Sequence, residues 1–312
     1  MLAKLFGRAG PHYVSPGLVD FNAAGLHEYN GCYAVVLDSI FSEAELSAFL
    51  AEAEASAPWE VAQVNTGPNS AYTDPTYRNG QRIIYDSFEL SEKIFEKVRP
   101  LLKDIEEFEE PTYLKGNVKA VQKWRMVRLN ERLRFLRYPS GGFFRRHCDG
   151  AYLDNKTGQR TFYTLQFYLP SDASGSKQSF VPAEGGTTRF LGRFSKSYAD
   201  VEAIPGRVLV FQHADLLHTG EEVTSGVKCT VRSDILYERV GEPVPVVVKC
   251  KRVTLNFFPA NRSSSYPRSP GRPALSRSNP RNASIVRDSP ITAPIVVRTC
   301  KSGLLGFPKI FS

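Results

Sequence analysis

Two histidines and one aspartate in the middle of the chain are the residues whose types and spacing could do chemistry. His147 and Asp149 stand two positions apart, and His218 lies further along the chain. In an extended strand, side chains two positions apart leave the same face, so His147 and Asp149 would converge. Two imidazoles and one carboxylate form the facial ligand set that holds non-haem Fe(II) and leaves coordination positions open. The sequence therefore predicts an iron site at these three residues.

Strand-like segments separated by turns surround the three residues. The segment 138–149 reads as a strand, a glycine turn and a second strand, which predicts a hairpin with the metal pair just inside it. Period-two alternation and turn residues predict further strands over 161–169 and 206–213, and a turn followed by a strand over 184–191. His218 then begins the segment 218–228, which closes the series.

Three motifs occur in order between Arg137 and Lys228. They read Arg-Tyr-x-x-Gly-x-x-Phe-x-x-His-x-Asp, Gly-Gly-x-Thr and His-x-Gly-x-x-Val-x-x-Gly-x-Lys. The ordered set resembles the iron- and 2-oxoglutarate-dependent dioxygenase superfamily, in particular the catalytic domain of the prolyl 4-hydroxylase alpha subunit. The resemblance implies a mainly β (α+β) protein with flanking helices and a double-stranded β-helix, or jelly-roll, core. It also implies Fe(II) held by the three predicted ligands, 2-oxoglutarate and O2 as cosubstrates, and L-ascorbate as an auxiliary.

Three further residues are candidates for holding the carboxylate of 2-oxoglutarate that lies far from the metal. Lys228 resembles the lysine that does so in the prolyl-hydroxylase branch, and Tyr138 resembles a tyrosine that hydrogen-bonds the same carboxylate. Arg232 shares a strand face with Lys228, and other branches use an arginine near this position. A guanidinium could grip the carboxylate through two hydrogen bonds. We favour Lys228, and the other reading of Arg232 is a buried ion pair with Asp234 or another acid.

Neighbouring positions leave further alternatives open. His213 precedes His218 by five residues and competes with it as the distal ligand, although the resemblance makes His213 a neighbour of the site. Thr164 and Gln166 share one face of a predicted strand, so they could line the pocket or pack in the core.

The sequence predicts four regions. Residues 1–30 are expected to be a poorly ordered leader, and residues 31–118 a support region of helices and strands. The jelly-roll domain is expected over 119–248, followed by a basic, disordered tail over 249–312 that is rich in Ser, Pro and Arg. The tail has too few apolar residues to offset the entropy cost of ordering it.

Helix and strand signals lie in the first half of the chain. Ser42 and Glu45 form a capping box, which predicts a helix over 42–56. An apolar stripe predicts a second helix over 89–108, with Pro100 kinking or splitting it because proline lacks an amide donor. Two strands are expected further on, over 120–129 and 132–138.

The formal net charge of +8 belongs to the tail. Residues 249–312 contain twelve Lys or Arg and one acidic residue, which leaves 28 basic and 31 acidic residues, a net charge of −3, in residues 1–248. Because a basic face is the electrostatic footprint of nucleic-acid binding, this distribution argues against nucleic acid as a partner of the catalytic region.

Hydropathy and cysteine usage point to an intracellular protein. No segment approaches the roughly twenty apolar residues of a membrane span, and no secretion signal is evident. The five cysteines are scattered without a Cys-x-x-Cys pair, which argues against a disulfide framework. We expect a cytoplasmic or nuclear protein with no membrane partner, and the sequence leaves its oligomeric state open.

Together these features predict a 2-oxoglutarate-dependent dioxygenase that hydroxylates a C–H bond and releases succinate and CO2. Its substrate would be a protein side chain such as proline, or a small molecule, because a fold and a metal triad do not name a substrate. The alternative is a metal-binding jelly roll without oxygenase activity, that is, a cupin-like binding or scaffold protein.

Overall fold

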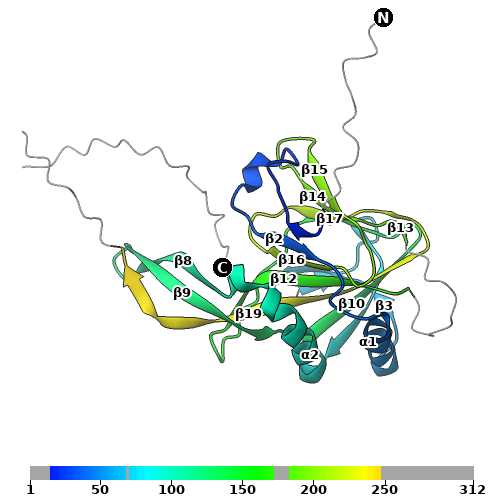
Figure 1. Cartoon of the computed structure of the whole chain (residues 1–312), viewed down its shortest axis with the longest axis horizontal. Coiled ribbons are helices and arrows are strands. Elements are labelled where there is room, and N and C mark those ends of the chain that lie inside the picture. The colour runs from blue at the N-terminus through cyan, green and yellow to red at the C-terminus, as the bar shows by residue number, and fades with distance from the viewer. Residues whose placement is uncertain (1–14, 68–69, 172–182, 247–312) are drawn as a thin grey trace, which may run out of the picture. The chain divides into compact units, whose positions relative to one another are not determined.

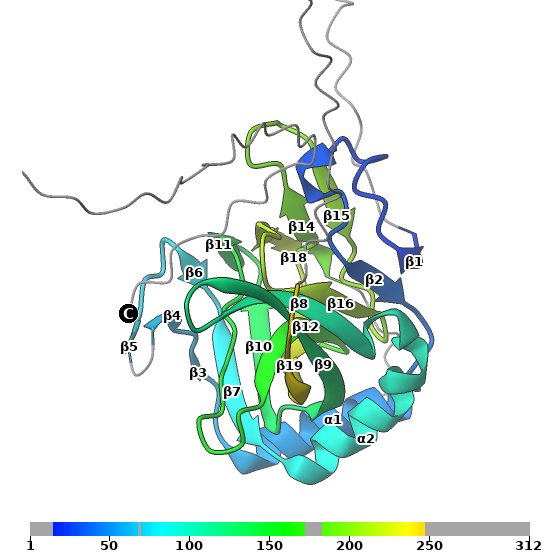
Figure 2. The same ribbon diagram turned by 90° about the vertical axis from the view of Figure 1, so that its left-hand side faces the viewer.

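The computed structural model describes residues 15–67, 70–171 and 183–246. All of them belong to one compact unit, Met1–Cys250. A second unit, Lys251–Ser312, lies outside the described residues, and so does the tail predicted over 249–312, because description ends at residue 246. Strands dominate the described part, and two helices flank them (Figures 1 and 2).

The larger of two main sheets has ten antiparallel strands. Its order is β1-β2-β16-β12-β19-β10-β7-β3, and β9 pairs with both β19 and β8. The strands are β1 (Gly17–Leu18), β2 (Ala34–Leu37), β3 (Glu60–Val61), β7 (Gln81–Asp86), β8 (Glu107–Leu114), β9 (Val118–Leu129), β10 (Arg132–Pro139), β12 (Arg160–Leu169), β16 (Val208–Gln212) and β19 (Val227–Pro245). The strands predicted around β9, β10, β12 and β16 are confirmed.

The smaller sheet has five strands in the order β15-β14-β17-β11-β6. They are β6 (Arg78–Asn79), β11 (Phe143–His147), β14 (Thr188–Leu191), β15 (Tyr198–Val201) and β17 (His218–Gly220). Two further pairs join β4 (Val64–Gly67) to β5 (Ser70–Tyr72) and β13 (Glu184–Gly185) to β18 (Val223–Ser225). The turn and strand predicted over 184–191 are confirmed, because Gly185 and Gly186 have positive φ and β14 follows them.

Apolar side chains of both sheets fill part of the space between them. Tyr168 and Phe211 of the larger sheet are buried in one cluster with Phe190 of the smaller sheet. The rings of Phe190 and Phe211 meet edge to face, with centroids 5.5 Å apart. Two antiparallel sheets that enclose a shared interior form a jelly roll, so the predicted fold class is confirmed.

Helix α1 (Glu43–Ser56) packs on the outer face of the larger sheet (Figure 1). The Ser42 hydroxyl accepts from the Glu45 amide, and the Glu45 carboxylate accepts from the Ser42 amide, so the predicted capping box is confirmed. Phe49 of the helix meets Phe167 of β12, with ring centroids 6.3 Å apart.

Helix α2 (Phe88–Val98) lies beside α1 and ends just before Pro100. The chain continues in the 3-10 turns η2 (Arg99–Leu101) and η3 (Lys103–Ile105), and a third such turn, η1 (His27–Tyr29), lies near the start of the described chain. The split at Pro100 is confirmed, because proline cannot donate the amide hydrogen bond that would extend the helix. Among the described residues, no helix is long and apolar enough to cross a membrane.

The glycine turn before His147 carries the chain from one sheet to the other. β10 pairs with β7 and β19 in the larger sheet, whereas β11 pairs with β6 and β17 in the smaller one. The predicted hairpin is therefore wrong. Gly141 has φ +77°, and a Cβ added to Gly142 would lie 2.7 Å from the Pro139 carbonyl oxygen, so the two glycines permit a tight corner.

Residues 15–30 are part of the fold, so the predicted disordered leader is wrong for this segment. Phe21, Leu26 and Tyr29 are buried, and the Tyr29 hydroxyl donates to the Leu191 carbonyl at 2.6 Å. These apolar residues follow neither helical nor strand periodicity, and their burial depends on contacts with distant strands. Residues 1–14 lie outside the described part.

The predicted support region contributes strands to the larger sheet. β2 pairs with β16, and β7 pairs with β10. The boundary between 118 and 119 stays a prediction.

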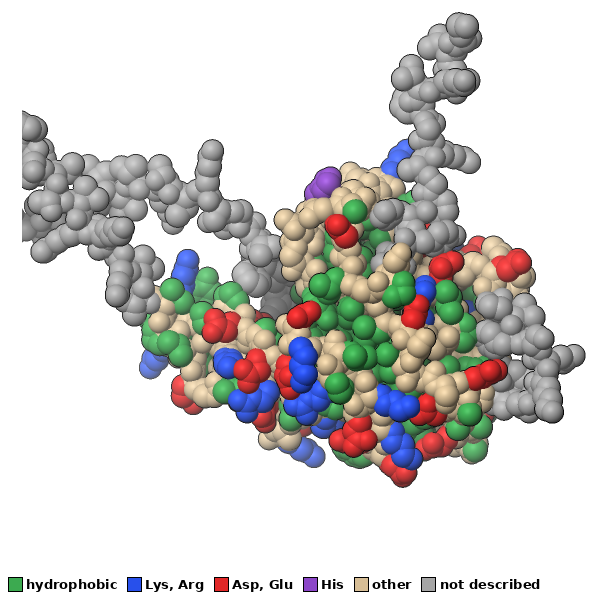
Figure 3. Space-filling view, viewed as in Figure 1, with side chains coloured by type: hydrophobic (Ala, Val, Ile, Leu, Met, Phe, Trp, Pro, Cys, Tyr) green, Lys and Arg blue, Asp and Glu red, His purple; other side chains and the backbone are tan. Residues whose placement is uncertain are grey.

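Acidic and basic side chains are interspersed on the face seen in Figure 3. Ion pairs at the surface of the described part include Glu107 with Lys123 and Arg125, and Glu106 with Arg99 and Lys103. Exposed pairs of this kind contribute little to stability. This face carries no broad area of one sign among the side chains that the figure colours.

Candidate functional site

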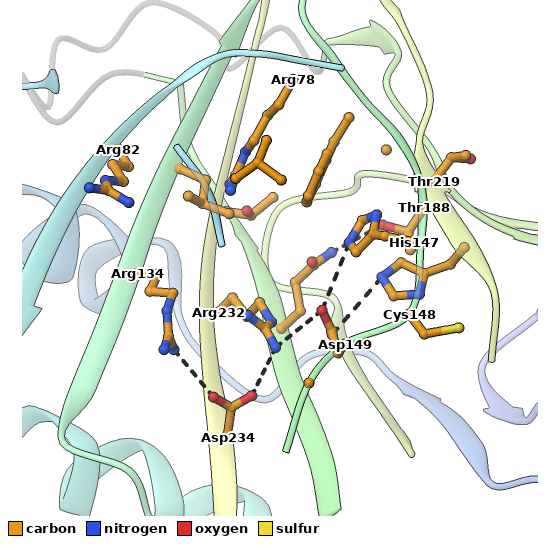
Figure 4. Close-up of a pocket in the computed structure, with 18 of the residues that line it drawn as sticks. Arg78, Arg82, Arg134, His147, Cys148, Asp149, Thr188, Thr219, Arg232 and Asp234 are labelled. Atoms are coloured by element: carbon orange, nitrogen blue, oxygen red, sulfur yellow. Dashed lines mark hydrogen bonds and ion pairs between the residues drawn. The ribbon is translucent and has the colours of Figure 1, made fainter. Parts of the chain in front are cut away.

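His147, Asp149 and His218 come together in a cavity between the two sheets. Figure 4 shows His147 and Asp149 in this cavity. Their ligand atoms all lie within 4.8 Å of one another. His147 Nε2 is 3.8 Å from Asp149 Oδ1, and His218 Nε2 is 3.9 Å from Asp149 Oδ2. His147 ends β11 and His218 begins β17, and the pairing register places them opposite each other. The structure thus brings the three predicted residues together.

Both imidazoles keep Nε2 available for a metal ion. His147 Nδ1 lies 2.7 Å from the Arg145 carbonyl oxygen, and His218 Nδ1 lies 3.0 Å from the Leu216 carbonyl oxygen. A carbonyl only accepts, so each Nδ1 carries the proton and each Nε2 keeps its lone pair. Hydrogen bonds of this kind orient metal-binding histidines, so the three residues fit a metal ion.

The protonation states of the three residues also suit a cation. Burial lowers the pKa of His147 to about 3 and lowers the pKa of His218 as well. Burial by itself would raise the pKa of Asp149, but the Arg232 guanidinium and the two imidazoles hold it well below its usual range. Neutral imidazole and ionised carboxylate are the forms that bind metal.

Both oxygens of Asp149 are held by neighbouring side chains. The Thr164 hydroxyl donates to Oδ2 at 2.6 Å, and Arg232 Nη2 lies 3.1 Å from Oδ1. Arg232 Nη2 also donates to Asp234 Oδ1 at 3.0 Å (Figure 4). The alternative predicted for Arg232, an ion pair with Asp234 or another acid, is therefore present, and the structure identifies Asp149 as the second acid.

His213 neighbours the site but is not part of the triad. It is buried, and its Nε2 lies 3.3 Å from Asp234 Oδ1. Arg134 Nη1 donates to the other oxygen of Asp234 at 3.2 Å. Asp234 therefore lies between three basic side chains and holds Arg232 in place from the side away from Asp149.

Lys228 lines the same cavity on the strand face predicted for it. Its side chain is buried, and burial lowers its pKa to about 8. Within the described chain, no carboxylate lies within 4.0 Å of its Nζ. The rings of Tyr138 and Tyr168 lie beside the amine, with centroids 5.8 Å and 5.6 Å from Nζ. A buried amine without a counter-ion is unfavourable, so its surroundings suit an incoming anion.

The side chains of β19 and β12 alternate between the cavity and the core, as the sequence indicates. The cavity-facing side chains of β19 are Lys228, Thr230, Arg232 and Asp234, and those buried toward the helices are Cys229, Val231 and Ile235. On β12, Gln166 lines the cavity and donates to the Thr188 hydroxyl at 3.0 Å. Thr164 and Gln166 therefore both serve the site.

Arg78 is a cavity residue that the sequence did not indicate. It lies on β6, a two-residue strand within a segment rich in Asn, Gly, Pro and Tyr, where no periodicity can be read. Its Nη2 donates to the Tyr138 hydroxyl at 3.1 Å. Only the pairing of β6 with β11 brings it to the site.

Solved structures with similarity to this chain include three prolyl hydroxylases. A viral collagen prolyl hydroxylase from Paramecium Bursaria Chlorella virus-1, in a 2OG complex, is 18% identical over 66% of this chain and 97% of its own, with a TM-score of 0.41. A prolyl-4-hydroxylase from Pseudomonas putida is 17% identical over 69% and 99%, with a TM-score of 0.44. A prolyl hydroxylase from Trichoplax adhaerens, in complex with a hypoxia inducible factor peptide fragment, is 12% identical over 69% and 89%, with a TM-score of 0.43.

A family model covers the part of the chain that holds the site. No curated protein sequence matches the chain. Residues 133–233, however, match the model of the 2OG-Fe(II) oxygenase superfamily, a family that implies Fe(II), 2-oxoglutarate and O2. This segment includes all three residues of the triad and Lys228. The resemblance seen in the sequence is thereby confirmed: the region that builds the site is similar to the 2OG-Fe(II) oxygenase superfamily.

Proposed function

We propose that this chain is a dioxygenase that uses 2-oxoglutarate and O2 to hydroxylate a C–H bond of its substrate. The observation that carries the proposal is the convergence of two imidazole Nε2 atoms and one ionised carboxylate in a cavity of the family-matched region. Fe(II), when bound, supplies the activation of O2 and the oxidative decarboxylation of 2-oxoglutarate to succinate and CO2.

His147, Asp149 and His218 would hold the iron, and their neighbours would keep them in position. The carbonyls of Arg145 and Leu216 orient the imidazoles. Thr164 and Arg232 hold the carboxylate from its two sides, so Asp149 needs little rearrangement to bind a metal. A preorganised set of ligands of this kind favours metal binding without a large entropy cost.

We assign the far carboxylate of 2-oxoglutarate to Lys228 and Tyr138. Lys228 Nζ lies over Gly220, 3.9 Å from the position that an added Cβ would take, and Gly220 follows His218 by two residues on β17. Positions two apart on a strand are separated by roughly 6.6 Å. The two carboxyl carbons of an extended five-carbon diacid are about 5 Å apart. The spacing between the histidine and the lysine therefore suits this cosubstrate.

Arg232 is the weaker candidate for the same role. Its Nη2 already contacts the carboxylates of Asp149 and Asp234 at 3.1 Å and 3.0 Å. Releasing it for a ligand would leave two buried carboxylates without this partner, which is costly. These contacts support Lys228.

Room for a substrate group remains in the cavity. Its volume is about 1160 Å³, slightly above the range of roughly 300–1,000 Å³ for ligand pockets. Hydroxylation of a prolyl side chain is the first reaction to test, because the motifs resemble that branch, and a small molecule is the other substrate class. L-ascorbate is proposed as an auxiliary reductant for this reaction.

The test is an anaerobic titration of 2-oxoglutarate into Fe(II)-loaded protein, followed by the weak visible metal-to-ligand charge-transfer band. We expect a saturable band in the natural protein and none in His218→Ala. His213→Gln is the matched control, because His213 is buried nearby but lies outside the triad, and it should keep the band. Tight iron binding without any band in the natural protein would contradict the proposal and favour a jelly roll without oxygenase activity.

A further inference from the structure

Arg78 is a cation in the site cavity that the proposed chemistry does not use. Its side chain extends from β6 into the cavity (Figure 4). Nη1 donates to the Gln63 carbonyl at 3.0 Å, and Nη2 donates to the Tyr138 hydroxyl at 3.1 Å. The guanidinium carbon lies 4.4 Å from the ring centroid of Phe144. The side chain is thus fixed in position by neutral partners.

The other arginines of the cavity are neutralised by carboxylates. Arg82 pairs with Glu60 at 2.8 Å, and Arg134 pairs with Asp234 at 3.2 Å. Arg232 contacts two carboxylates, as described above. In the ranges that the structure describes, Arg78 has no carboxylate within 4.0 Å, and its buried Nε has no hydrogen-bond partner.

Arg78 lies at one end of a row of residues across the smaller sheet, and Lys228, from β19 of the larger sheet, lies over another residue of that row. Phe144 stands opposite Arg78 on one side and opposite Gly220 on the other. The Arg78 guanidinium covers Phe144, whereas Lys228 Nζ lies over Gly220. Phe144 in turn stacks on the His147 imidazole, with ring centroids 3.7 Å apart. Arg78 therefore lies on the His147 side of the cavity, and Lys228 lies on the His218 side.

The charges of the proposed complex leave Arg78 unmatched. Asp149 is shared between the metal and Arg232, and Asp234 is shared between Arg134 and Arg232. The two carboxylates of 2-oxoglutarate are taken by the metal and Lys228. None of these anions is left for Arg78, and such a cation in a partly buried pocket favours the binding of one.

We propose that Arg78 binds a carboxylate, and that this group belongs to the substrate, which is therefore an acidic molecule or side chain. The inference rests on the proposed function, because it places the substrate beside the proposed cosubstrate. A planar guanidinium can bind a carboxylate through two parallel hydrogen bonds. The Tyr138 hydroxyl accepts from Arg78, which leaves the single proton of that hydroxyl for the far carboxylate of 2-oxoglutarate assigned to it above.

A carboxylate at Arg78 could have a second source, the far end of 2-oxoglutarate itself. The two sources can be separated with 2-oxopentanoate, which has the same chain but lacks the far carboxylate. The variant is Arg78→Met, which keeps an unbranched apolar side chain over Phe144. Arg82→Met is the matched control, because Arg82 lines the same cavity but is already paired with Glu60.

The inference is tested by two binding measurements on Mn(II)-loaded full-length protein. Calorimetry gives the Kd of 2-oxoglutarate and of 2-oxopentanoate. Line broadening of the acetate methyl proton signal by the bound Mn(II), with 2-oxoglutarate at saturation, reports a carboxylate held close to the metal. We expect Arg78→Met to leave both calorimetric Kd values within about twofold and to weaken the acetate effect by about tenfold to a hundredfold. Arg82→Met should behave as the natural protein, and Arg78→Lys should restore part of the acetate effect.

Two results would overturn the inference. If Arg78→Met weakens 2-oxoglutarate but not 2-oxopentanoate, the carboxylate at Arg78 is that of the cosubstrate and the acidic substrate is excluded. If neither ligand nor the acetate effect changes, Arg78 binds no anion. Failure of the proposed function looks different, because the natural protein itself would then fail to bind 2-oxoglutarate.

Discussion

Lys228 is held in a state that makes it sensitive to both ligand and pH. The amine is buried beside two aromatic rings, and burial lowers its pKa to about 8 because the charged form loses solvation. Near neutral pH the ammonium form still prevails, and an anionic ligand would relieve the cost of keeping it charged. Burial makes the charged form of Lys228 costly in the free protein. The same burial therefore favours the binding of a carboxylate beside it.

The affinity for 2-oxoglutarate should fall at alkaline pH. Lys228 is protonated below its pKa and loses its charge above it, so above about pH 8 the Kd should rise by about tenfold per pH unit. Calorimetric titrations of Mn(II)-loaded protein between pH 7 and 9.5 measure this. The ligand 2-oxopentanoate should lack the dependence, and a Kd for 2-oxoglutarate that stays constant across this range would refute the role of Lys228.

Removal of Lys228 should abolish the preference for 2-oxoglutarate over 2-oxopentanoate. A buried charge-assisted contact contributes about 1.5–3 kcal/mol, so Lys228→Met should weaken 2-oxoglutarate by about tenfold to a hundredfold and leave the truncated acid unchanged. Arg232→Met is the counterpart, and it should retain the preference, because Arg232 is engaged by Asp149 and Asp234. The opposite pattern would show that Arg232 binds the far carboxylate.

In the strands near the site, one face packs in the core and the other face lines the cavity. On β12, Leu165 and Phe167 pack toward α1 and α2, whereas Thr164 and Gln166 face the cavity and hydrogen-bond there. The same division along β19 places the ion pairs of the site on a scaffold whose other face is fully buried. Because side chains alternate strictly along a strand, a slip of one residue would exchange the two faces and disrupt both core and site.

The corner between β10 and β11 is the element on which the position of His147 depends most. A Cβ on Gly142 would lie 2.7 Å from the Pro139 carbonyl oxygen and 3.0 Å from Tyr138 Cβ. Gly142→Ala should therefore lower the free energy of unfolding by about 1–3 kcal/mol and weaken Mn(II) binding as His147 shifts. Chemical denaturation and metal titration measure the two effects. Gly150→Ala is the control, because its added methyl group meets nothing within 4 Å, and equal losses in both variants would disprove the steric argument.

At the scale of the whole molecule, the two faces of the larger sheet have different roles: one packs the core and the other lines the site. The outer face is buried by the helices, and the inner face, together with the smaller sheet, encloses the cavity. Ligands that enter this cavity contact both sheets, so binding is coupled to the folding of the entire unit. The described cysteines, Cys32, Cys148 and Cys229, are free thiols, so no disulfide among them contributes to this stability.

Metal and cosubstrate together should therefore stabilise the folded chain. A ligand that binds only the folded state at a hundred times its Kd adds about 2.7 kcal/mol to the free energy of unfolding. We expect Mn(II) with 2-oxoglutarate to raise the midpoint of thermal unfolding, and a chelator to reverse the increase. The midpoint of His218→Ala should not respond, and a response of equal size in that variant would place the metal elsewhere.

The features that could be predicted from the sequence are those that depend on local patterns of residues. The order of His147, Asp149, His218 and Lys228 within the motifs indicated the resemblance to the 2OG-Fe(II) oxygenase superfamily and the candidate ligands. The capping box at Ser42, the helix end at Pro100 and the alternation along β12 and β19 were also predictable, because each depends on neighbours within a few residues.

Only the tertiary structure decided which residues meet across the fold. It placed β10 and β11 in different sheets, joined Arg232 to Asp149, brought Arg78 to the site from a two-residue strand, and buried residues 21, 26 and 29. Strand pairing and buried ion pairs depend on contacts between residues far apart in the chain. A periodic pattern shows which face of a strand is polar, but the strand that will lie beside it is set by the packing of the whole core.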